Sequence, residues 1–462
     1  MKLPTTLVLP VWLADEIAER AREDVEAAGV LIAGVARSEA GLKLLGRELH
    51  WVPEDEYTRR TAVGMTIRSG GYVPSLQRAE SLGAVAIWLH THPGHDADPR
   101  RSDHDHAVDD ELRSTFRIRL DTDVYGSLVA APAPSAFRFT GMSVDEAGSG
   151  SIDRLLVVGD RWALLSAEDV PDAAEIPTMF DRQVRAFGGD IQRVLSRLRV
   201  GIVGCGGTGS AVAEQLARLG LGHMLLVDPK DLSDSNVARV YGSTPPDVGK
   251  PKAEVLASHI ARIAPDVMVE AVVGTVTDET VARMLTACDI VFGCTDDNAG
   301  RLVLSRLSSH YLLPVIDVGV LISSSDGRLD GIHGRVTVLT PGQACLVCRG
   351  RVDMERARAE QLDTAELQGL QAEGYAPELG AVEPAVVPYT SMVASVAVAE
   401  LLERFIAYGP DEEPSETLIR CHDREMSTNI VLPRSGHYCD PDAGSLGVGD
   451  REQFLDRTWR AA

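Results

Sequence analysis

The chain has few cysteines, no long apolar run and far fewer basic than acidic residues. Its 462 residues include seven cysteines, none before Cys205, which is too few for a framework of disulfides. No stretch approaches the ~20 consecutive apolar residues that cross a bilayer, so we expect no membrane contact. Lysine and arginine number 45 against 68 acidic residues, a net charge of −23. Such a field repels phosphate backbones, so nucleic acid is not an expected partner.

The beginning of the chain also lacks a basic segment followed by an apolar one, so no secretory signal is expected and we predict a cytoplasmic protein. The length predicts two or three domains. In residues 1–169, a helical pattern over 11–28 and apolar strands over 29–36 and 84–93 are typical of an α+β unit. Further strands are expected over 125–132, 137–144 and 154–166, followed by an acidic linker over 166–177.

Residues 170–440 alternate between apolar strands and amphipathic helices, starting with a helical pattern over 181–198 and a buried strand up to Gly204. This alternation predicts a doubly wound α/β domain. Residues 350–382 are polar, carry no cysteine and are expected to form a crossover segment or lid. We expect residues 441–462 to form a C-terminal tail.

Histidine and aspartate gather in residues 90–106, which hold five of the twelve histidines and four aspartates. His90 and His92 follow a predicted strand, where alternate side chains share a face and both imidazoles can reach one ion. Asp105 would be the third ligand and leave a position for water, as in hydrolytic zinc sites. For His95, His104 and His106 we expect only solvated side chains.

A glycine-rich turn joins a predicted strand to a predicted helix near residue 205. Its glycines are Gly204, Gly206, Gly207 and Gly209, and they let the backbone and the helix start approach phosphate groups. Asp228 ends the next strand, where an acid can bond a ribose hydroxyl. Alone, this pattern is also typical of dehydrogenases. Asn236, Arg239, Lys252 and Asp296 favour a nucleoside triphosphate with magnesium instead.

Cys345 and Cys348 form a C-x-x-C, a spacing that commonly supplies half of a structural zinc site. No second C-x-x-C follows. The remaining candidates are Cys421, His422, His437 and Cys439, among which Cys439 with either His437 or Cys421 is preferred. Alternatively, the C-x-x-C packs without a metal.

His90-Thr91-His92-Pro93, followed by Ser102 to Asp105, resembles the H-x-H-P…S-x-x-D motif of the JAB/MPN (JAMM) metalloproteases. The resemblance implies a JAB/MPN-like domain over 1–169, with catalytic zinc on His90, His92 and Asp105. It also implies that Glu26 moves a proton between water and the leaving amine, and that Ser102 stabilises the oxyanion. The gap between Pro93 and Ser102 is longer than in that motif, which leaves Asp103 as an alternative ligand; Glu23 is the alternative base.

Residues 180–435 resemble the ThiF/MoeB/E1 superfamily, which adenylates the C-terminal glycine of ubiquitin-like and sulfur-carrier proteins. The matching segments include GIVGCGGTG, VDPKDLSDSNVAR, GKPKAEVL, GCTDDNAGR and CLVC. The resemblance implies a Rossmann-like fold in which Asp228 binds ribose and Asp296 binds magnesium. Asn236, Arg239 and Lys252 would hold the triphosphate, and Arg182 would reach across a homodimer as an arginine finger.

Together the two resemblances imply one substrate class, a small ubiquitin-like or sulfur-carrier protein ending in glycine. The main interpretation is a fused JAB–E1 protein that matures or deconjugates this carrier and adenylates it, in a bacterial ubiquitin-like pathway of the kind associated with antiphage defence. The alternative is sulfur-carrier activation and release in cysteine, thiamine or molybdopterin-type biosynthesis. An E2-like protein or a sulfurtransferase would be the acceptor. A third interpretation, a scaffold with degenerate sites, is disfavoured because most catalytic positions are filled.

Overall fold

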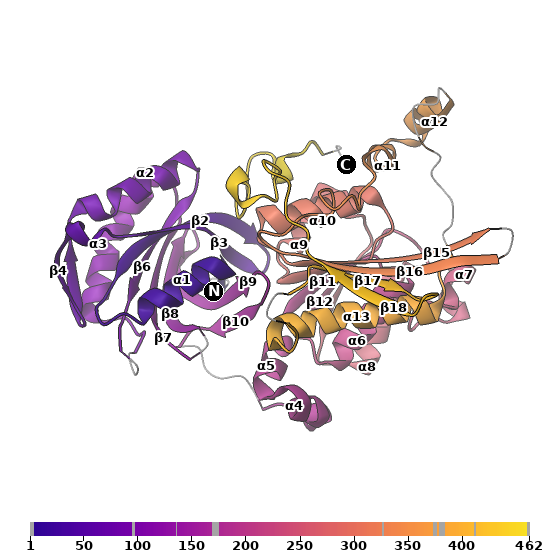
Figure 1. The fold of residues 1–462 in the computed structure, drawn as a ribbon, viewed down its shortest axis with the longest axis horizontal. Helices are drawn as coiled ribbons and strands as arrows, with labels where there is room; N and C mark the ends of the chain where they lie inside the picture. The colour runs from indigo at the N-terminus through magenta and orange to yellow at the C-terminus, as the bar shows by residue number, and fades with distance from the viewer. Residues whose placement is uncertain are drawn as a thin grey trace. The chain divides into compact units, whose positions relative to one another are not determined.

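The computed structural model in Figure 1 contains two compact units. It describes residues 4–94, 98–134, 136–168, 175–325, 328–372, 377, 384–410 and 413–459. The first unit comprises Met1–Ala173, His310–Leu312 and Ser445–Glu452, and the second comprises Ala174–Ser309, Leu313–Gly444 and Gln453–Ala462. The residues expected to form a tail are therefore divided between the two units.

The first unit is built on an eight-stranded sheet that closes on itself. Its strands follow the order β1 (Thr5–Pro10), β3 (Gly41–Trp51), β2 (Ala28–Ser38), β6 (Val85–Thr91), β7 (Tyr125–Pro132), β8 (Phe137–Asp145), β9 (Gly148–Val158) and β10 (Ala163–Ser166). Closure comes from β1, which pairs in parallel with β3 and with β9. A separate hairpin consists of β4 (Tyr57–Thr61) and β5 (Gly64–Ile67).

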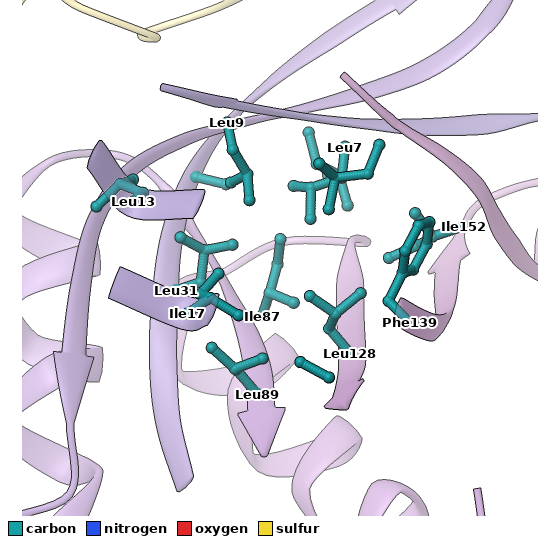
Figure 2. Close-up of a cluster of buried hydrophobic side chains, with 14 of the residues drawn as sticks. Leu7, Leu9, Leu13, Ile17, Leu31, Ile87, Leu89, Leu128, Phe139 and Ile152 are labelled. Carbon is teal, nitrogen blue, oxygen red and sulfur yellow. The ribbon is translucent and has the colours of Figure 1, made fainter. Parts of the chain in front are cut away.

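Alternation along the strands produces two hydrophobic cores. One contains Leu13 and Ile17 of α1 (Val11–Ala21) with strand residues such as Ile87 and Leu89 (Figure 2). The other contains Trp88 with residues of α2 (Val73–Ser81) and α3 (Asp103–Leu120). Because side chains alternate along β6, His90 lies on the same face as Trp88, the face covered by α3.

A short C-terminal segment completes the first unit. Gly449 forms a parallel bridge with Val35 near the end of β2, and the Asp450 amide donates to the Val35 carbonyl at 2.7 Å. The φ of Gly449 is +67°, and a Cβ there would lie 2.2 Å from the Val35 oxygen, so only glycine fits. This segment covers backbone of β2 beyond the residues that pair with β6.

The second unit contains an eight-stranded sheet with a parallel half and an antiparallel half. Its order is β13 (Met268–Val272), β12 (His223–Val227), β11 (Arg199–Val203), β14 (Ile290–Gly293), β15 (Val315–Ser325), β16 (Arg328–Leu339), β17 (Glu416–Arg420) and β18 (Glu425–Asn429). The strands from β13 to β15 are parallel, and β15 to β18 are antiparallel. This confirms the predicted Rossmann-like α/β fold.

Helices connect and cover these strands. They are α4 (Asp181–Phe187), α5 (Gly189–Arg197), α6 (Gly207–Arg218), α7 (Asp234–Val237), α8 (Lys252–Ile263), α9 (Glu279–Leu285), α10 (Asn298–His310), α11 (Met354–Ala359), α12 (Thr364–Ala372) and α13 (Val387–Ile406). The long helix α13 packs against α6, β15 and β16. None of the helices in the described ranges is long and apolar enough to cross a membrane.

Two predicted helices end earlier than expected. The helix predicted over 11–28 stops at Ala21, because β2 already begins at Ala28. The helix predicted over 181–198 is divided at Gly188, whose φ is +86°. The predicted crossover segment contains α11 and α12, but residues 373–376 and 378–382 lie outside the described range.

Candidate functional site

The first candidate site lies at the end of β6, against the start of α3. His90 is buried, and its Nε2 lies 3.2 Å from Oδ1 of Asp105. His92 follows two residues later, with its Nε2 3.7 Å from Oδ2 of the same carboxylate. Ligand atoms of these three residues all lie within 4.8 Å of one another. The structure therefore brings together the predicted metal ligands, and two imidazoles with a carboxylate are donors that catalytic zinc sites use.

Asp105 owes its position to the start of α3. Ser102 caps the helix by accepting from the Asp105 amide, and the Asp105 carboxylate accepts from the Ser102 amide and hydroxyl, both at 2.7 Å. Burial alone would raise the pKa of Asp105, but the interactions with His90 and Ser102 lower it well below its ordinary value. The carboxylate is thus ionised as a ligand must be. Asp103, the alternative ligand, is exposed.

Glu26 lies in the segment between α1 and β2 and is half-buried. Its backbone is held by hydrogen bonds to Thr61 and from Arg60 of the β4–β5 hairpin. Burial raises the pKa of Glu26, while the nearby His90 and His92 oppose that rise. A carboxylate near the ligand set with a raised pKa suits proton transfer. Glu23, the alternative base, instead forms ion pairs with Arg20 and Arg60.

A buried aspartate anchors the loop that carries Ser102. Asp109 of α3 accepts hydrogen bonds from Tyr125 and Ser127 of β7, at 2.8 and 2.9 Å, and from Arg101 at 3.1 Å. These contacts fix the start of α3 against the sheet. The role of Asp109 cannot be predicted from the motif, because nothing in the sequence distinguishes it from the exposed acids around it.

The second candidate site is the turn between β11 and α6. Gly204 has φ of +96°, and a Cβ there would lie 2.6 Å from the Cys294 carbonyl at the end of β14. A Cβ at Gly209 would lie 1.8 Å from the Gly204 oxygen, so both positions require glycine. A Cβ at Gly206 would meet nothing within 4 Å. Space is therefore open at Gly206, the residue before the first turn of α6, at the point where strand order reverses and where open α/β sheets bind ligands.

Asp228 holds this turn in place. Its carboxylate accepts from the amides of Cys205 and Lys230, at 2.7 and 2.8 Å, and it is buried. The predicted ribose ligand thus also has a structural role. Lys252 lies at the start of α8 and is buried. Burial and the charge of Asp228 raise the pKa of Cys205, and the charge of Lys252 partly lowers it again. The aliphatic part of Arg239 lies beside Gly207, and its guanidinium donates to the Ser235 carbonyl.

The remaining predicted residues of this site differ in their exposure and in their hydrogen bonds. Asn236 caps α7 by accepting from the Ser233 amide. Asp296, just after β14, is exposed, whereas its neighbour Asp297 is engaged by Thr295 and by the Gly300 amide. Of these two aspartates Asp296 is the exposed one, and its role as a magnesium ligand stays a prediction. Arg182 of α4 is also exposed, as a residue that reaches another subunit must be.

Sequence analysis assigned no role to Thr390 of α13, whose hydroxyl would lie 3.3 Å from a Cβ at Gly207. It also missed Tyr241, which bonds Ser391 of α13 and, through its amide, Ser210 of α6. These contacts fix the open helix start against α13.

The third cluster joins two distant loops. Ligand atoms of Cys345, Cys348, His437 and Cys439 lie within 4.8 Å of one another. The Cys348 and Cys439 sulfurs are 3.6 Å apart, close to the roughly 3.8 Å that tetrahedral zinc imposes with Zn–S bonds of ~2.3 Å. The hydrogen bond that Cys439 donates to Cys345 lowers the pKa of Cys345 and raises that of Cys439, so the thiolate of this pair forms first at Cys345. His437, and not Cys421, is the fourth member.

Comparison with known proteins identifies the second unit. A family model described as "ThiF family" matches residues 180–439. The chain belongs to the ThiF family. It is 31% identical over 182 residues to the molybdopterin-synthase adenylyltransferase of Escherichia coli (38% of this chain, 70% of the relative). It is 30% identical over 161 residues to the sulfur carrier protein ThiS adenylyltransferase of the same organism (34% of this chain, 61% of the relative).

Among solved structures, the microcin C7 biosynthetic enzyme MccB in complex with N-formylated MccA shares 18% identity with a TM-score of 0.46, over 56% of this chain and 74% of that chain. The predicted ThiF/E1-like domain is thus confirmed by the family match. The JAB/MPN resemblance of residues 1–169 stays a prediction.

Proposed function

We propose that the ThiF-family unit uses ATP to adenylate the C-terminal carboxylate of a small sulfur-carrier or ubiquitin-like protein. The observation that carries the proposal is the meeting of an open helix start and an exposed carboxylate, Asp296, at one edge of a ThiF-family sheet. Two relatives are named as adenylyltransferases of molybdopterin synthase and of a sulfur carrier protein, which favours the sulfur-carrier alternative.

In this proposal the chain positions the reacting groups. The amides at the start of α6 and the cations of Arg239 and Lys252 bind the phosphates of ATP. Asp296 would hold Mg²⁺, which neutralises charge that develops on the phosphates. A carboxylate oxygen of the carrier forms a bond to the α-phosphorus of ATP. The bond between the α-phosphorus and the oxygen that bridges the α- and β-phosphates breaks, and pyrophosphate leaves.

Carrier-dependent exchange between ATP and labelled pyrophosphate tests this function. The probes are purified sulfur carriers and ubiquitin-like proteins that end in Gly-Gly. We expect Asp296→Ala to abolish exchange. The matched control is Asp266→Ala, an exposed aspartate before β13, at the opposite edge of the parallel strands. Full exchange by Asp296→Ala would overturn the assignment of that residue, and no exchange by the unmodified protein with any carrier would overturn the function.

We propose a second function for the first unit, zinc-dependent hydrolysis of a bond that follows a carrier's C-terminal glycine. The proposal is supported by the convergence of His90, His92 and Asp105 beside Glu26. Bound zinc would supply an activated water, since it lowers the pKa of water to about 7. Glu26 would take the proton of that water and return it to the leaving amine.

The test uses a linear fusion of a sulfur carrier to a short peptide after its Gly-Gly. We expect zinc-dependent release of the peptide and its loss in His92→Ala. The matched control is His106→Ala, an exposed histidine of α3 outside the cluster. Equal cleavage by both variants, or cleavage that survives removal of zinc, would refute this second function.

A further inference from the structure

A pocket of about 440 Å³ lies on the antiparallel half of the second sheet, and arginines dominate its charged lining. Gly319 of β15, Arg335 of β16 and Leu418 of β17 form one row across the sheet, because the register pairs Gly319 with Arg335 and Arg335 with Leu418. Arg301 reaches the pocket from α10, and Arg351 reaches it from the loop after the cysteines. The pocket was not foreseen from the sequence.

Two guanidinium groups converge above a residue that has no side chain. A Cβ at Gly319 would lie 3.3 Å from Nη2 of Arg335 and 3.8 Å from Nη2 of Arg301. Both arginines are mostly buried, with side-chain exposures of 13% and 16%. A small group seated above Gly319 would therefore meet two partly desolvated cations at once.

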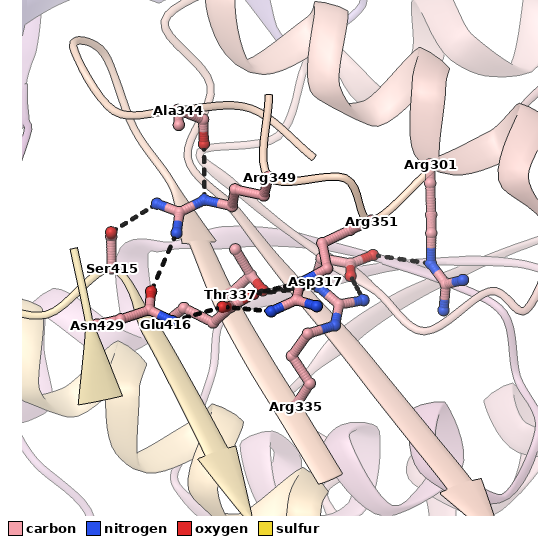
Figure 3. Close-up of polar contacts among 10 residues, drawn as sticks. All are labelled: Arg301, Asp317, Arg335, Thr337, Ala344, Arg349, Arg351, Ser415, Glu416 and Asn429. Atoms are coloured by element: carbon pink, nitrogen blue, oxygen red, sulfur yellow. Dashed lines mark hydrogen bonds and ion pairs between the residues drawn. The ribbon is translucent and has the colours of Figure 1, made fainter. Parts of the chain in front are cut away.

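The residues that line the pocket include four arginines, Arg301, Arg335, Arg351 and Arg420, and no aspartate or glutamate. Figure 3 shows three of them, Arg301, Arg335 and Arg351, together with Asp317 and Glu416. Asp317 is shared, at 2.6 Å from Arg335 and 3.4 Å from Arg301. Glu416 accepts two hydrogen bonds from Arg351. Arg420 pairs with Glu425 at 2.5 Å. These carboxylates hold the guanidinium groups in place without lining the pocket, and a lining with four arginines and no acid favours an anion.

The pocket continues from the edge at which adenylation is proposed. Arg301 lies in the first turn of α10, five residues after Asp296, and Asp317 pairs in register with Gly293 at the end of β14. Gly319 lies two residues along β15 from Asp317, so an extended tail whose carboxylate lies at this edge would bring a residue a few positions upstream over Gly319.

We propose that this pocket binds an aspartate or glutamate side chain in the carrier's C-terminal tail, a few residues before the terminal glycine. The inference rests on the proposed adenylation function and adds to it a rule for substrate choice. Carboxylates match the paired guanidinium forks, and a lysine at that position would be rejected by like charge.

Short peptides separate this proposal from the adenylation function. Each peptide of the first set is a polyalanine that ends in Gly-Gly and carries one glutamate, placed at a different one of the four preceding positions in each peptide. The second set carries glutamine at the same positions. Binding is measured without ATP by fluorescence anisotropy, and pyrophosphate exchange is measured in parallel. We expect one glutamate peptide to bind about tenfold better than its glutamine counterpart, as a charge-assisted hydrogen bond predicts.

Gly319→Ala places a methyl group between the two guanidinium groups and leaves every charge intact, and Arg301→Gln removes one cation. Both variants should reduce the glutamate advantage to within twofold without changing binding of the glutamine peptides. Gly369→Ala, in an open position on α12, is the control. No glutamate advantage at any position would overturn the proposal. An equal loss for both peptide sets would also overturn it, because the pocket would then bind the terminal carboxylate. A glutamate advantage without exchange would support the pocket and count against adenylation.

Discussion

At the scale of single residues, Glu26 and Glu23 show how alike two glutamates are in sequence and how different in structure. Glu26 is half-buried near His90 and His92, which act on its pKa, whereas Glu23 is held by two arginines. Of these two glutamates, Glu26 is the one that lies near the cluster. The choice of base therefore depends on contacts that spacing alone does not reveal.

We expect Glu26→Gln to keep zinc bound and to lower cleavage of a carrier–peptide fusion by roughly 100-fold or more, because the amide cannot accept the proton. Zinc content by mass spectrometry and release of the peptide are the measurements. Glu23→Gln is the matched control and should retain turnover. Full activity of Glu26→Gln would show that another group moves the proton.

Glu416 gives a second prediction at this scale, on pH. Burial alone would raise its pKa, but hydrogen bonds from Arg351 and Asn429 lower it from 4.5 to about 2. The stability it contributes is thus present above pH 4.5 and is lost as the pH falls towards 2. We expect Glu416→Gln to lower the unfolding free energy at pH 7 by roughly 2 kcal/mol, with the difference shrinking below pH 4.5.

Thermal melts at pH values from 7 to 3 measure this trend. Glu425→Gln is the control, since Glu425 is exposed and pairs with Arg420 on the surface of β18; exposed pairs contribute about 0–1 kcal/mol. A constant difference between Glu416→Gln and the unmodified protein at all these pH values would contradict the assignment.

At the scale of elements, the loop after β16 and the segment after β18 are joined by the cysteine cluster. Zinc there would tie two segments that are 89 residues apart, from Cys348 to His437. We expect one zinc ion in the second unit, and we expect Cys348→Ser and His437→Ala to lose it and to lower Tm, since a structural ion stabilises the folded state. Cys421→Ser should change neither quantity. Loss of zinc from Cys421→Ser with retention in His437→Ala would reverse the ligand assignment.

Elements also show how far sequence analysis could reach. The glycine turn and the His90–His92 pair were found because local spacing dictates their geometry. The end of α1 was missed because apolar residues keep helical spacing up to Ala28, where tertiary pairing with His90 wins. His437 could not be separated from Cys421, since only packing decides which loop reaches Cys345. The pocket around Gly319 has no local motif, because its arginines come from separate elements.

At the scale of the whole molecule, residues 350–382, the predicted crossover segment, contain no cysteine. This segment therefore offers the ThiF-family unit no thiol that could attack the carrier adenylate. Among the other candidates, Cys439 belongs to the cluster, and burial raises the pKa of Cys421. Neither is a ready nucleophile. We expect the reaction to stop at the carrier adenylate, which an acceptor thiol on another protein then attacks. Non-reducing electrophoresis after incubation with ATP and carrier should show no reductant-sensitive adduct. A band lost in Cys421→Ala would contradict this expectation.

Arg182 concerns the assembly. If it completes the ATP site of a second copy, Arg182→Ala should lose pyrophosphate exchange, as Asp296→Ala does. A mixture of the two variants should regain roughly a quarter of the activity, because random pairing yields half mixed dimers, each with one intact site. Absence of any recovery in a mixture shown to form mixed dimers would refute a role across subunits.

The bridge between Val35 and Gly449 determines when the first unit can complete its folding during synthesis. During synthesis, β2 leaves the ribosome more than 400 residues before its last partner does. The ThiF-family unit is almost wholly translated in between, so it can fold while the first unit still exposes unpaired strand backbone. A nascent chain stalled before residue 445 therefore carries an open β edge, which the segment Ser445–Glu452 covers once it has been synthesised.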